Sequence, residues 1–253
     1  SKAVTMWSPE NLFLVGIVFL FAGFVKGTVG LGLPTVSLAL LATTVGLQPA
    51  IALLLFPSIT TNIWQSLAGP HLKTLLRRLW LFLACVCFGA WIGAGVLATV
   101  NSAILMAILG VILVIYATIS LTLYQVPPPG HFEKPLNPIM GLASGFMTGM
   151  TGSFVVPGSL YLQALKMPRD MLIQSLGMSF TTVTIALGFS MGGFGLLDAD
   201  VLGVSAMAVL PALAGMTVGI RIRNRLPEEK FRKVFFLALL ILGIYISLRA
   251  FLS

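Results

Sequence analysis

The sequence predicts an all-α membrane protein, an inverted repeat of two halves with one broken-helix hairpin and three transmembrane helices in each. Three observations lead to this fold class. Hydrophobic residues make up 58% of the 253 residues and charged residues 9%, whereas soluble domains carry about 25% charged residues. Several apolar segments reach the length of about 20 residues that a helix needs to cross a bilayer. Glycine and proline also recur with the same spacing in both halves of the chain.

Ten apolar segments follow one another along the chain. Six are long and end at turn or charge signals, so we expect each to be a full transmembrane helix; they cover 50–69, 79–99, 103–124, 171–196, 201–220 and 233–252. The other four form two glycine-interrupted pairs, 12–46 and 138–165, which we interpret as hairpins of half-length helices. In an alternative, both segments of a pair cross the membrane fully. The number of membrane crossings in each half then stays odd. The first segment lacks a cleavage pattern and is expected to belong to the mature fold.

A proline-rich segment, 125–137, divides the chain into a first repeat, 1–124, and a second, 138–253. Its prolines cannot continue a helix and make it a stiff linker. The breaks in the two halves share their glycine spacing: Gly23, Gly27, Gly30 and Pro34 are matched by Gly145, Gly149, Gly152 and Pro157. A later Gly-x3-Gly pair, typical of helix contacts, occurs once in each half, at Gly89 and Gly93 and at Gly215 and Gly219.

Basic residues predict the orientation in the membrane, because cytoplasmic loops carry excess Lys and Arg. They gather in two loops, with His71, Lys73, Arg77 and Arg78 in one and Arg221, Arg223, Arg225, Lys230, Arg232 and Lys233 in the other. If both basic loops lie in the cytoplasm, the two hairpins must enter the membrane from opposite sides. The two halves of the chain then have opposite orientations in the membrane. We therefore expect a multi-pass protein of a bacterial inner membrane with both termini in the periplasm. Such repeats place the substrate where their broken helices meet.

The reactive residues argue against an enzyme, a metal site and a cofactor. The two histidines, His71 and His131, fall in predicted loops, and no Asp or Glu falls within a predicted span, so neither a metal site nor an acid–base pair can form. Cys85 and Cys87 do not face each other on a helix and are interpreted as packing residues. The net charge is +8, but the basic loops lack the aromatic residues of a nucleic-acid surface. The expected partners are a small anionic substrate and the lipid bilayer, with the chain a monomer or homodimer.

The two helix breaks are predicted to line one water-filled cavity, because non-helical backbone is tolerated at membrane depth only where protein or water surrounds it. Their candidate substrate-binding residues are Lys26, Gly27, Thr28, Gly30 and Gly32, and Gly149, Thr151, Gly152 and Ser153. Lys26 lies about 14 residues, or roughly 20 Å, into its helix. A charge at that depth marks a functional site unless the side chain snorkels to an interface. Free N–H groups at the starts of the following helices favour anions.

A polar stripe follows each hairpin on the next helix. The stripes consist of Ser58, Thr61, Asn62 and Gln65 in the first half and of Gln174, Ser175, Ser179 and Thr182 in the second. Spacings of three and four place each set on one helix face, and we predict that they contact the substrate. The alternative is that they hydrogen-bond to neighbouring helices. Trp64 either lines the cavity or anchors the helix at the interface.

The two breaks read FAGFVKGTVGLGLP and LASGFMTGMTGSFVVP, and each precedes a polar helix that starts after Pro49 or Pro168. In this arrangement, over nearly its whole length, the chain resembles the TauE/SafE family of membrane permeases. Members of that family export sulfite and organosulfonates such as sulfoacetate, so the resemblance implies a sulfur oxyanion substrate. Family breaks often carry consecutive glycines, whereas this chain has Gly30-Leu31-Gly32 and Gly152-Ser153.

The predicted function is export of a small sulfur oxyanion by alternating access, as one inverted half moves against the other. A proton-coupled carrier usually has an intramembrane carboxylate or histidine, and the predicted spans have neither. An anion leaving an inside-negative cell gains about 2.3 kcal/mol per charge and 100 mV, so the membrane potential and the substrate gradient suffice. Two alternatives are an anion channel and a non-transporting membrane subunit that docks a soluble partner through its basic loops.

Overall fold

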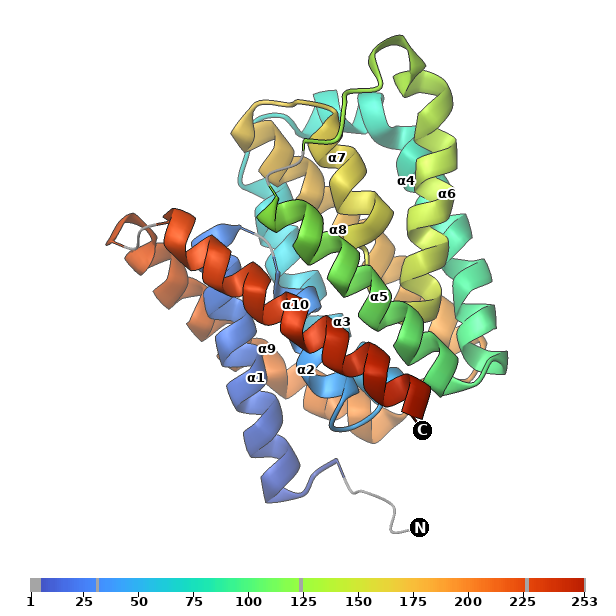
Figure 1. Cartoon of the computed structure of the whole chain (residues 1–253), viewed down its shortest axis with the longest axis vertical. Coiled ribbons are helices and arrows are strands. Elements are labelled where there is room, and N and C mark those ends of the chain that lie inside the picture. Colours follow the sequence, from blue (N-terminus) through green and yellow to red (C-terminus); the bar gives the residue numbers. More distant parts are fainter. Residues whose placement is uncertain (1–5, 31, 123–124, 226–227, 253) are drawn as a thin grey trace.

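The computed structural model describes residues 6–30, 32–122, 125–225 and 228–252, and this part is all-helical, without strands (Figure 1). Its α-helices are α1 (Pro9–Val29), α2 (Leu33–Ala42), α3 (Leu47–Leu67), α4 (Leu72–Thr99), α5 (Ser102–Leu121), α6 (Glu133–Thr151), α7 (Leu160–Ala164), α8 (Arg169–Gly193), α9 (Ala199–Ile222) and α10 (Glu228–Leu252). Within the described ranges, seven helices are long and apolar enough to span a bilayer. The predicted all-α membrane fold and its six long spans are confirmed.

The prediction of half-length helices is wrong for the first arm of each hairpin. α1 has 21 residues and α6 has 19, because nothing in either sequence stops the helix before the glycine that ends it, Gly30 or Gly152. α6 also begins inside the predicted linker, since its prolines lie in or near the first turns, where a missing N–H leaves few hydrogen bonds unmade. Only the second arms are short, with 10 residues in α2 and 5 in α7 after η2 (Val155–Ser159).

Helices α1 and α9 pack backbone against backbone through their glycines. A Cβ atom on Gly23 would lie 2.1 Å from the carbonyl oxygen of Ala212, and one on Gly215 would lie 2.0 Å from that of Leu20. Only a residue without a side chain fits at such a contact, which is the small-xxx-small packing of membrane helices. The glycine pattern of 215–219 is therefore confirmed as a helix-contact face.

Helices α4 and α6 form a second pair with the same register. A Cβ atom on Gly145 would lie 2.1 Å from the carbonyl oxygen of Val86, and one on Gly89 would lie 2.3 Å from that of Leu142. In both helix pairs, the first glycine of each Gly-x3-Gly motif faces the carbonyl three residues before the first glycine of the partner's motif. Each pair joins one helix from the first half of the chain to one from the second, so the two halves are interleaved.

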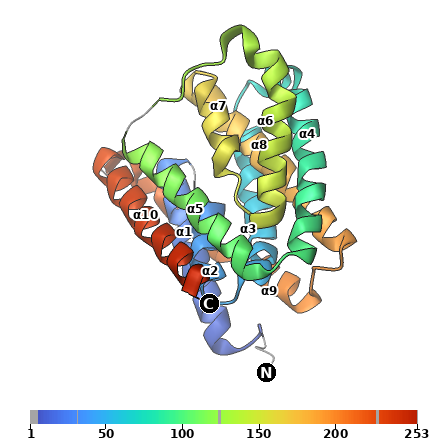
Figure 2. The same ribbon diagram turned by 45° about the vertical axis from the view of Figure 1, so that its right-hand side comes forward.

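The remaining long helices also pair across the halves, α3 with α8 and α5 with α10. Figure 2 shows α5 and α10 side by side, and Gly110 of α5 lies against the backbone of Gly243 and Ser247. The start of α1 and the end of α10 lie toward one end of the molecule, and the loops after α3, α7 and α9 lie toward the other (Figure 1). At the first end, Trp7 Nε1 donates to Asp200 Oδ1 at 3.1 Å. Which end faces the cytoplasm stays a prediction.

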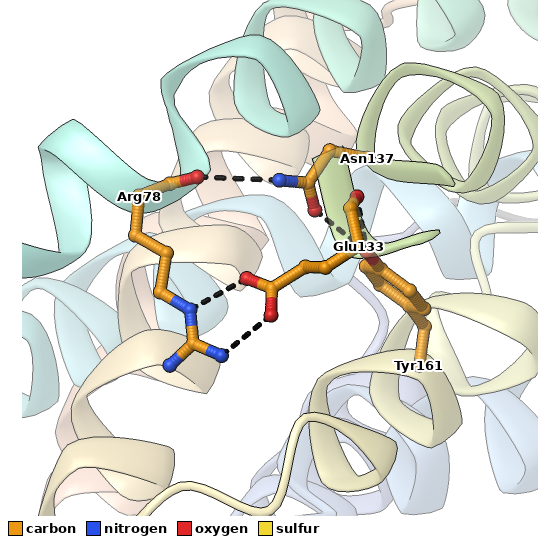
Figure 3. A network of polar contacts seen from close by, with 4 residues as sticks. All are labelled: Arg78, Glu133, Asn137 and Tyr161. Atoms are coloured by element: carbon orange, nitrogen blue, oxygen red, sulfur yellow. Dashed lines mark hydrogen bonds and ion pairs between the residues drawn. The ribbon is translucent and has the colours of Figure 1, made fainter. Parts of the chain in front are cut away.

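A polar network ties both arms of the second hairpin to α4 at the end of the basic loops (Figure 3). Arg78 donates from Nε and Nη2 to the two carboxylate oxygens of Glu133, at 2.6 and 2.8 Å. Asn137 donates to the Arg78 carbonyl at 3.2 Å, and Tyr161 donates to Asn137 Oδ1 at 2.7 Å. The ring of Tyr161 stacks on Phe82 of α4, with 5.6 Å between centroids. α4, α6 and α7 are thereby held as one unit.

Replacing Arg78 with alanine is expected to lower the melting temperature of the purified protein by about 2–4 °C, because the bidentate ion pair is worth about 1 kcal/mol at partial exposure. The Arg78 and Glu133 side chains are 32% and 21% exposed, which limits the loss to this size. Arg77→Ala is the control, since Arg77 is exposed and precedes Arg78 on the same helix. Equal melting temperatures for the two variants would show that the network adds no stability.

Candidate functional site

The first helix break is fixed by glycines in a backbone conformation that other residues rarely adopt. α1 ends at Val29, and Gly30 follows with φ 83° and donates its N–H to the Lys26 carbonyl at 2.8 Å. Gly32 has φ 109°, and Pro34 lies in the first turn of α2, where its missing N–H leaves no hydrogen bond unmade. The chain therefore turns sharply beside Lys26.

A cavity of about 290 Å³ lies beside this break. One wall comes from α1 and from the end of α9 with η3 (Arg223–Arg225): Lys26, Gly27, Gly30, Met216, Ile220 and Arg223. The opposite wall comes from the end of α3, the turn to α4 and the start of α8, and includes Trp64, Gln65, Gly69, Asp170, Ile173 and Gln174. α3 and α9 end and α8 begins where the basic loops lie, so the cavity belongs to that end of the molecule.

Lys26 is the one charged side chain among the buried polar residues of the described chain, with 3% of its surface exposed. Its Nζ donates to Oδ1 of Asn62. No carboxylate forms an ion pair with Lys26 among the described residues, in which the ion pair is the one between Arg78 and Glu133. Its place in the last turn of α1 is favourable, because a helix C-terminus attracts cations. A side chain this buried does not snorkel, and its uncompensated charge favours an anionic ligand.

Asn62 is held by a second hydrogen bond that fixes its orientation toward Lys26. Its Nδ2 donates to Ser58 Oγ at 3.0 Å, and Ser58 lies 3.3 Å from Thr184 Oγ1 on α8. All three partners are at least nine-tenths buried. Asn62 and Ser58 do not line the cavity themselves. They instead orient the Lys26 side chain, which does.

Gln65 and Trp64 line the cavity from α3, but in different ways. Gln65 donates from Nε2 to the Ile173 carbonyl at 2.8 Å, which links the two helices of that wall. Trp64 is 67% exposed and lies at the cavity, so its ring both borders the cavity and faces outward.

Several predicted ligands use their polar atoms on the protein backbone. Gln174 lines the cavity, yet it donates to the carbonyls of Ser66 and Gly69 at 2.7 and 2.8 Å and accepts from the N–H of His71 at 2.9 Å. It thus stabilises the turn between α3 and α4. Four hydroxyls donate to carbonyls of their own helices: those of Thr28, Thr61, Thr151 and Ser175. These four hydroxyls therefore bond within their own helices and not to a neighbouring helix.

The second helix break does not line the cavity beside Lys26 in this structure. Gly149, Thr151, Gly152, Ser153, Ser175 and Ser179 lie outside the cavity, as does Gly32. A Cβ atom on Gly152 would lie 2.8 Å from Cγ1 of Ile51 and 3.2 Å from Leu38, so side chains of α2 and α3 fill the space at the second break. The hydroxyls of Ser153 at this break and of Ser179 on α8 are buried and have no hydrogen-bond partner among the described residues.

The α9 side of the cavity was missed from sequence. Met216 and Ile220 are apolar residues of a span, and Arg223 was used only to orient the loops. The glycine spacing could have identified this wall. Gly23 and Gly27 have the same spacing as Gly215 and Gly219, and in the structure these two glycine faces pack together. Asp170, at the start of α8, was missed as well.

A model of the family described as sulfite exporter TauE/SafE matches residues 15–246. The match includes both helix breaks and every residue that lines the cavity. Comparisons with curated proteins and with solved structures give no significant match.

Proposed function

Since the chain belongs to the sulfite exporter TauE/SafE family, we propose that it exports a small sulfur oxyanion, either sulfite or an organosulfonate such as sulfoacetate. It is a multi-pass membrane transporter, with seven described helices able to span a bilayer. We place it in a bacterial inner membrane with the start of α1 and the end of α10 in the periplasm. The basic loops support this orientation, and the cavity then opens toward the cytoplasm.

The buried ammonium group of Lys26 is the observation that carries the proposal. It lines a cavity, has only a neutral hydrogen-bond partner in the described structure, and precedes a turn in which Gly30 leaves the backbone accessible to a ligand. A Cβ atom on Gly30 would have no other atom within 4 Å, so there is room beside Lys26. A sulfonate or sulfite oxygen accepting from Nζ would form a charge-assisted hydrogen bond, roughly twice as strong as a neutral one.

We further propose that the membrane potential and the substrate gradient drive export. The buried polar residues in the described part include no Asp, Glu or His, the groups that intramembrane proton coupling usually requires. The packed second break favours a carrier over a channel, because a channel needs a continuous path. A carrier with one closed end must change conformation in each cycle.

We also propose that 1–124 and 138–253 are inverted repeats joined by the linker 125–137. The contacts of Gly23 with Ala212 and of Gly145 with Val86 support this. When each residue of the first contact is replaced by its counterpart in the other half of the chain, the second contact results. Under that exchange Lys26 corresponds to Thr148, three residues after Gly145. Only one of the two breaks would then carry a cation.

Counterflow in proteoliposomes tests the function. Vesicles loaded with unlabelled sulfoacetate should take up labelled sulfoacetate faster than empty vesicles, and excess sulfite should compete if both anions share the site. Equal uptake with and without internal substrate would indicate a channel. A complete lack of uptake, together with no thermal stabilisation by sulfite, sulfoacetate, sulfate, taurine or acetate, would favour a non-transporting membrane subunit, because a bound ligand stabilises the fold by mass action.

A further inference from the structure

The cavity lies between two helix pairs, each joined by close contacts between its two helices. The α1–α9 pair is joined by backbone contacts, with Gly27 against Met216 and Gly219 against Phe24. The α3–α8 pair is joined by the amides of Gln65 and Gln174, both bonded to backbone carbonyls of the partner helix or its turn. Each cavity wall therefore belongs to one pair.

The two pairs pack against each other where α3 meets α9, and hydrogen bonds join them at the far end and at the cavity floor. At the far end, Ser205 of α9 donates to the Leu53 carbonyl of α3 at 2.7 Å and accepts from the N–H of Phe56 at 3.3 Å. At the floor, Lys26 of α1 donates to Asn62 of α3. Toward the basic loops the pairs separate around the cavity. A rotation of the α1–α9 pair relative to the α3–α8 pair, with the Ser205 contact as the hinge, would close the cavity.

Two opposite charges face each other across the open end. Asp170 lies in the first turn of α8 and Arg223 caps the end of α9, so they belong to opposite walls. Among the described residues neither side chain has an ion-pair partner. Asp170 is also the one acid lining a cavity otherwise suited to anions, which it would repel unless a cation neutralised it. The helix dipole stabilises an acid in the first turn of α8, but capture of an anion does not require one.

We propose that Asp170 and Arg223 form an ion pair when the α1–α9 pair swings against the α3–α8 pair, and that this pair holds the cavity closed. In the open state of the present structure, Arg223 faces the cavity and adds a second positive charge on the path of the anion. In the closed state it neutralises Asp170. The proposal rests on the transport function above and makes the helix pairs, rather than the sequence halves, the moving units.

A charge exchange tests the ion pair. Asp170→Arg and Arg223→Asp should each lower counterflow about tenfold, and the double variant should recover to within about threefold of the parent protein. Arg225→Asp is the matched control, because Arg225 ends the same short helix without lining the cavity, and it should transport like the parent. A double variant no better than the single ones would overturn the proposal.

A cross-link separates this proposal from the transport function, because it needs no substrate. In a protein with Cys85 and Cys87 replaced by serine, Asp170→Cys and Arg223→Cys should form a disulfide with a mild oxidant, which requires Cα atoms within about 7 Å. The pair Asp170→Cys and Arg225→Cys should not. Cross-linking of the first pair alone supports closure even if no anion is transported. Failure of that pair to cross-link in a folded protein contradicts it.

Discussion

Replacing Lys26 with methionine should weaken sulfite or sulfoacetate binding by about 10- to 100-fold, since a hydrogen bond to a charged group contributes about 1.5–3 kcal/mol. Methionine keeps most of the volume of the side chain and removes only the charge and its donors. Counterflow should fall with affinity. Thermal shift titration of the purified protein measures the binding loss directly.

The same substitution should leave the melting temperature of the ligand-free protein unchanged or raise it. A buried ammonium bonded to one neutral amide is costly to desolvate, and methionine removes that cost. This result would separate a loss of binding from a loss of folding. Lys73→Met is the control, because Lys73 is exposed in the first turn of α4. Equal affinity in the Lys26 and Lys73 variants would remove Lys26 from the site.

A single methyl group at Gly23 should destabilise the protein by about 3 kcal/mol or more, which corresponds to a fall in melting temperature of about 6–12 °C. The new Cβ atom would meet three backbone atoms of Ala212, at 2.1, 2.9 and 3.1 Å. Backbone cannot move aside as a side chain does, so α1 and α9 would have to separate. Fluorescence-detected size exclusion after heating measures the change.

Gly16→Ala is the control for this prediction, because Gly16 lies two turns earlier on α1 and a Cβ atom there meets no atom within 4 Å. This variant should be as stable as the parent or slightly more so, since alanine favours a helix over glycine by about 0.5–1 kcal/mol. Similar melting temperatures for the Gly16 and Gly23 variants would mean that the α1–α9 contact is looser than the structure has it.

The long helices and the breaks could be predicted because each depends on local sequence. An uninterrupted apolar segment such as 103–124 has few alternatives to a membrane helix, and Gly30 and Gly152 end helices that no other residue stops. The lengths of α1 and α6 could not be predicted by the same reasoning. Their depth in the membrane depends on the helices they pack against, and those partners come from the other half of the chain.

The candidate site was predicted in part. Lys26 and Gln65 were placed correctly at a cavity, since a buried charge and a large amide are costly in an apolar protein unless they serve a purpose. Gln174 was predicted as a ligand because it belongs to the polar stripe on one face of its helix, yet its amide bonds the α3–α4 turn. Sequence spacing gives the face of a helix but not the partner that the face meets. For the same reason Arg223 and Asp170 were missed.

The pairing of α1 with α9 has a consequence for biogenesis. The hydrogen bond between Trp7 and Asp200 joins residues 193 positions apart. The contact between Gly23 and Ala212 likewise joins the start of the chain to a residue translated much later. Since α1 precedes α9 in the chain, α1 reaches the bilayer long before its neighbour has been translated. Until then the glycine face of α1 and Lys26 must contact lipid, water or the insertion machinery in place of α9.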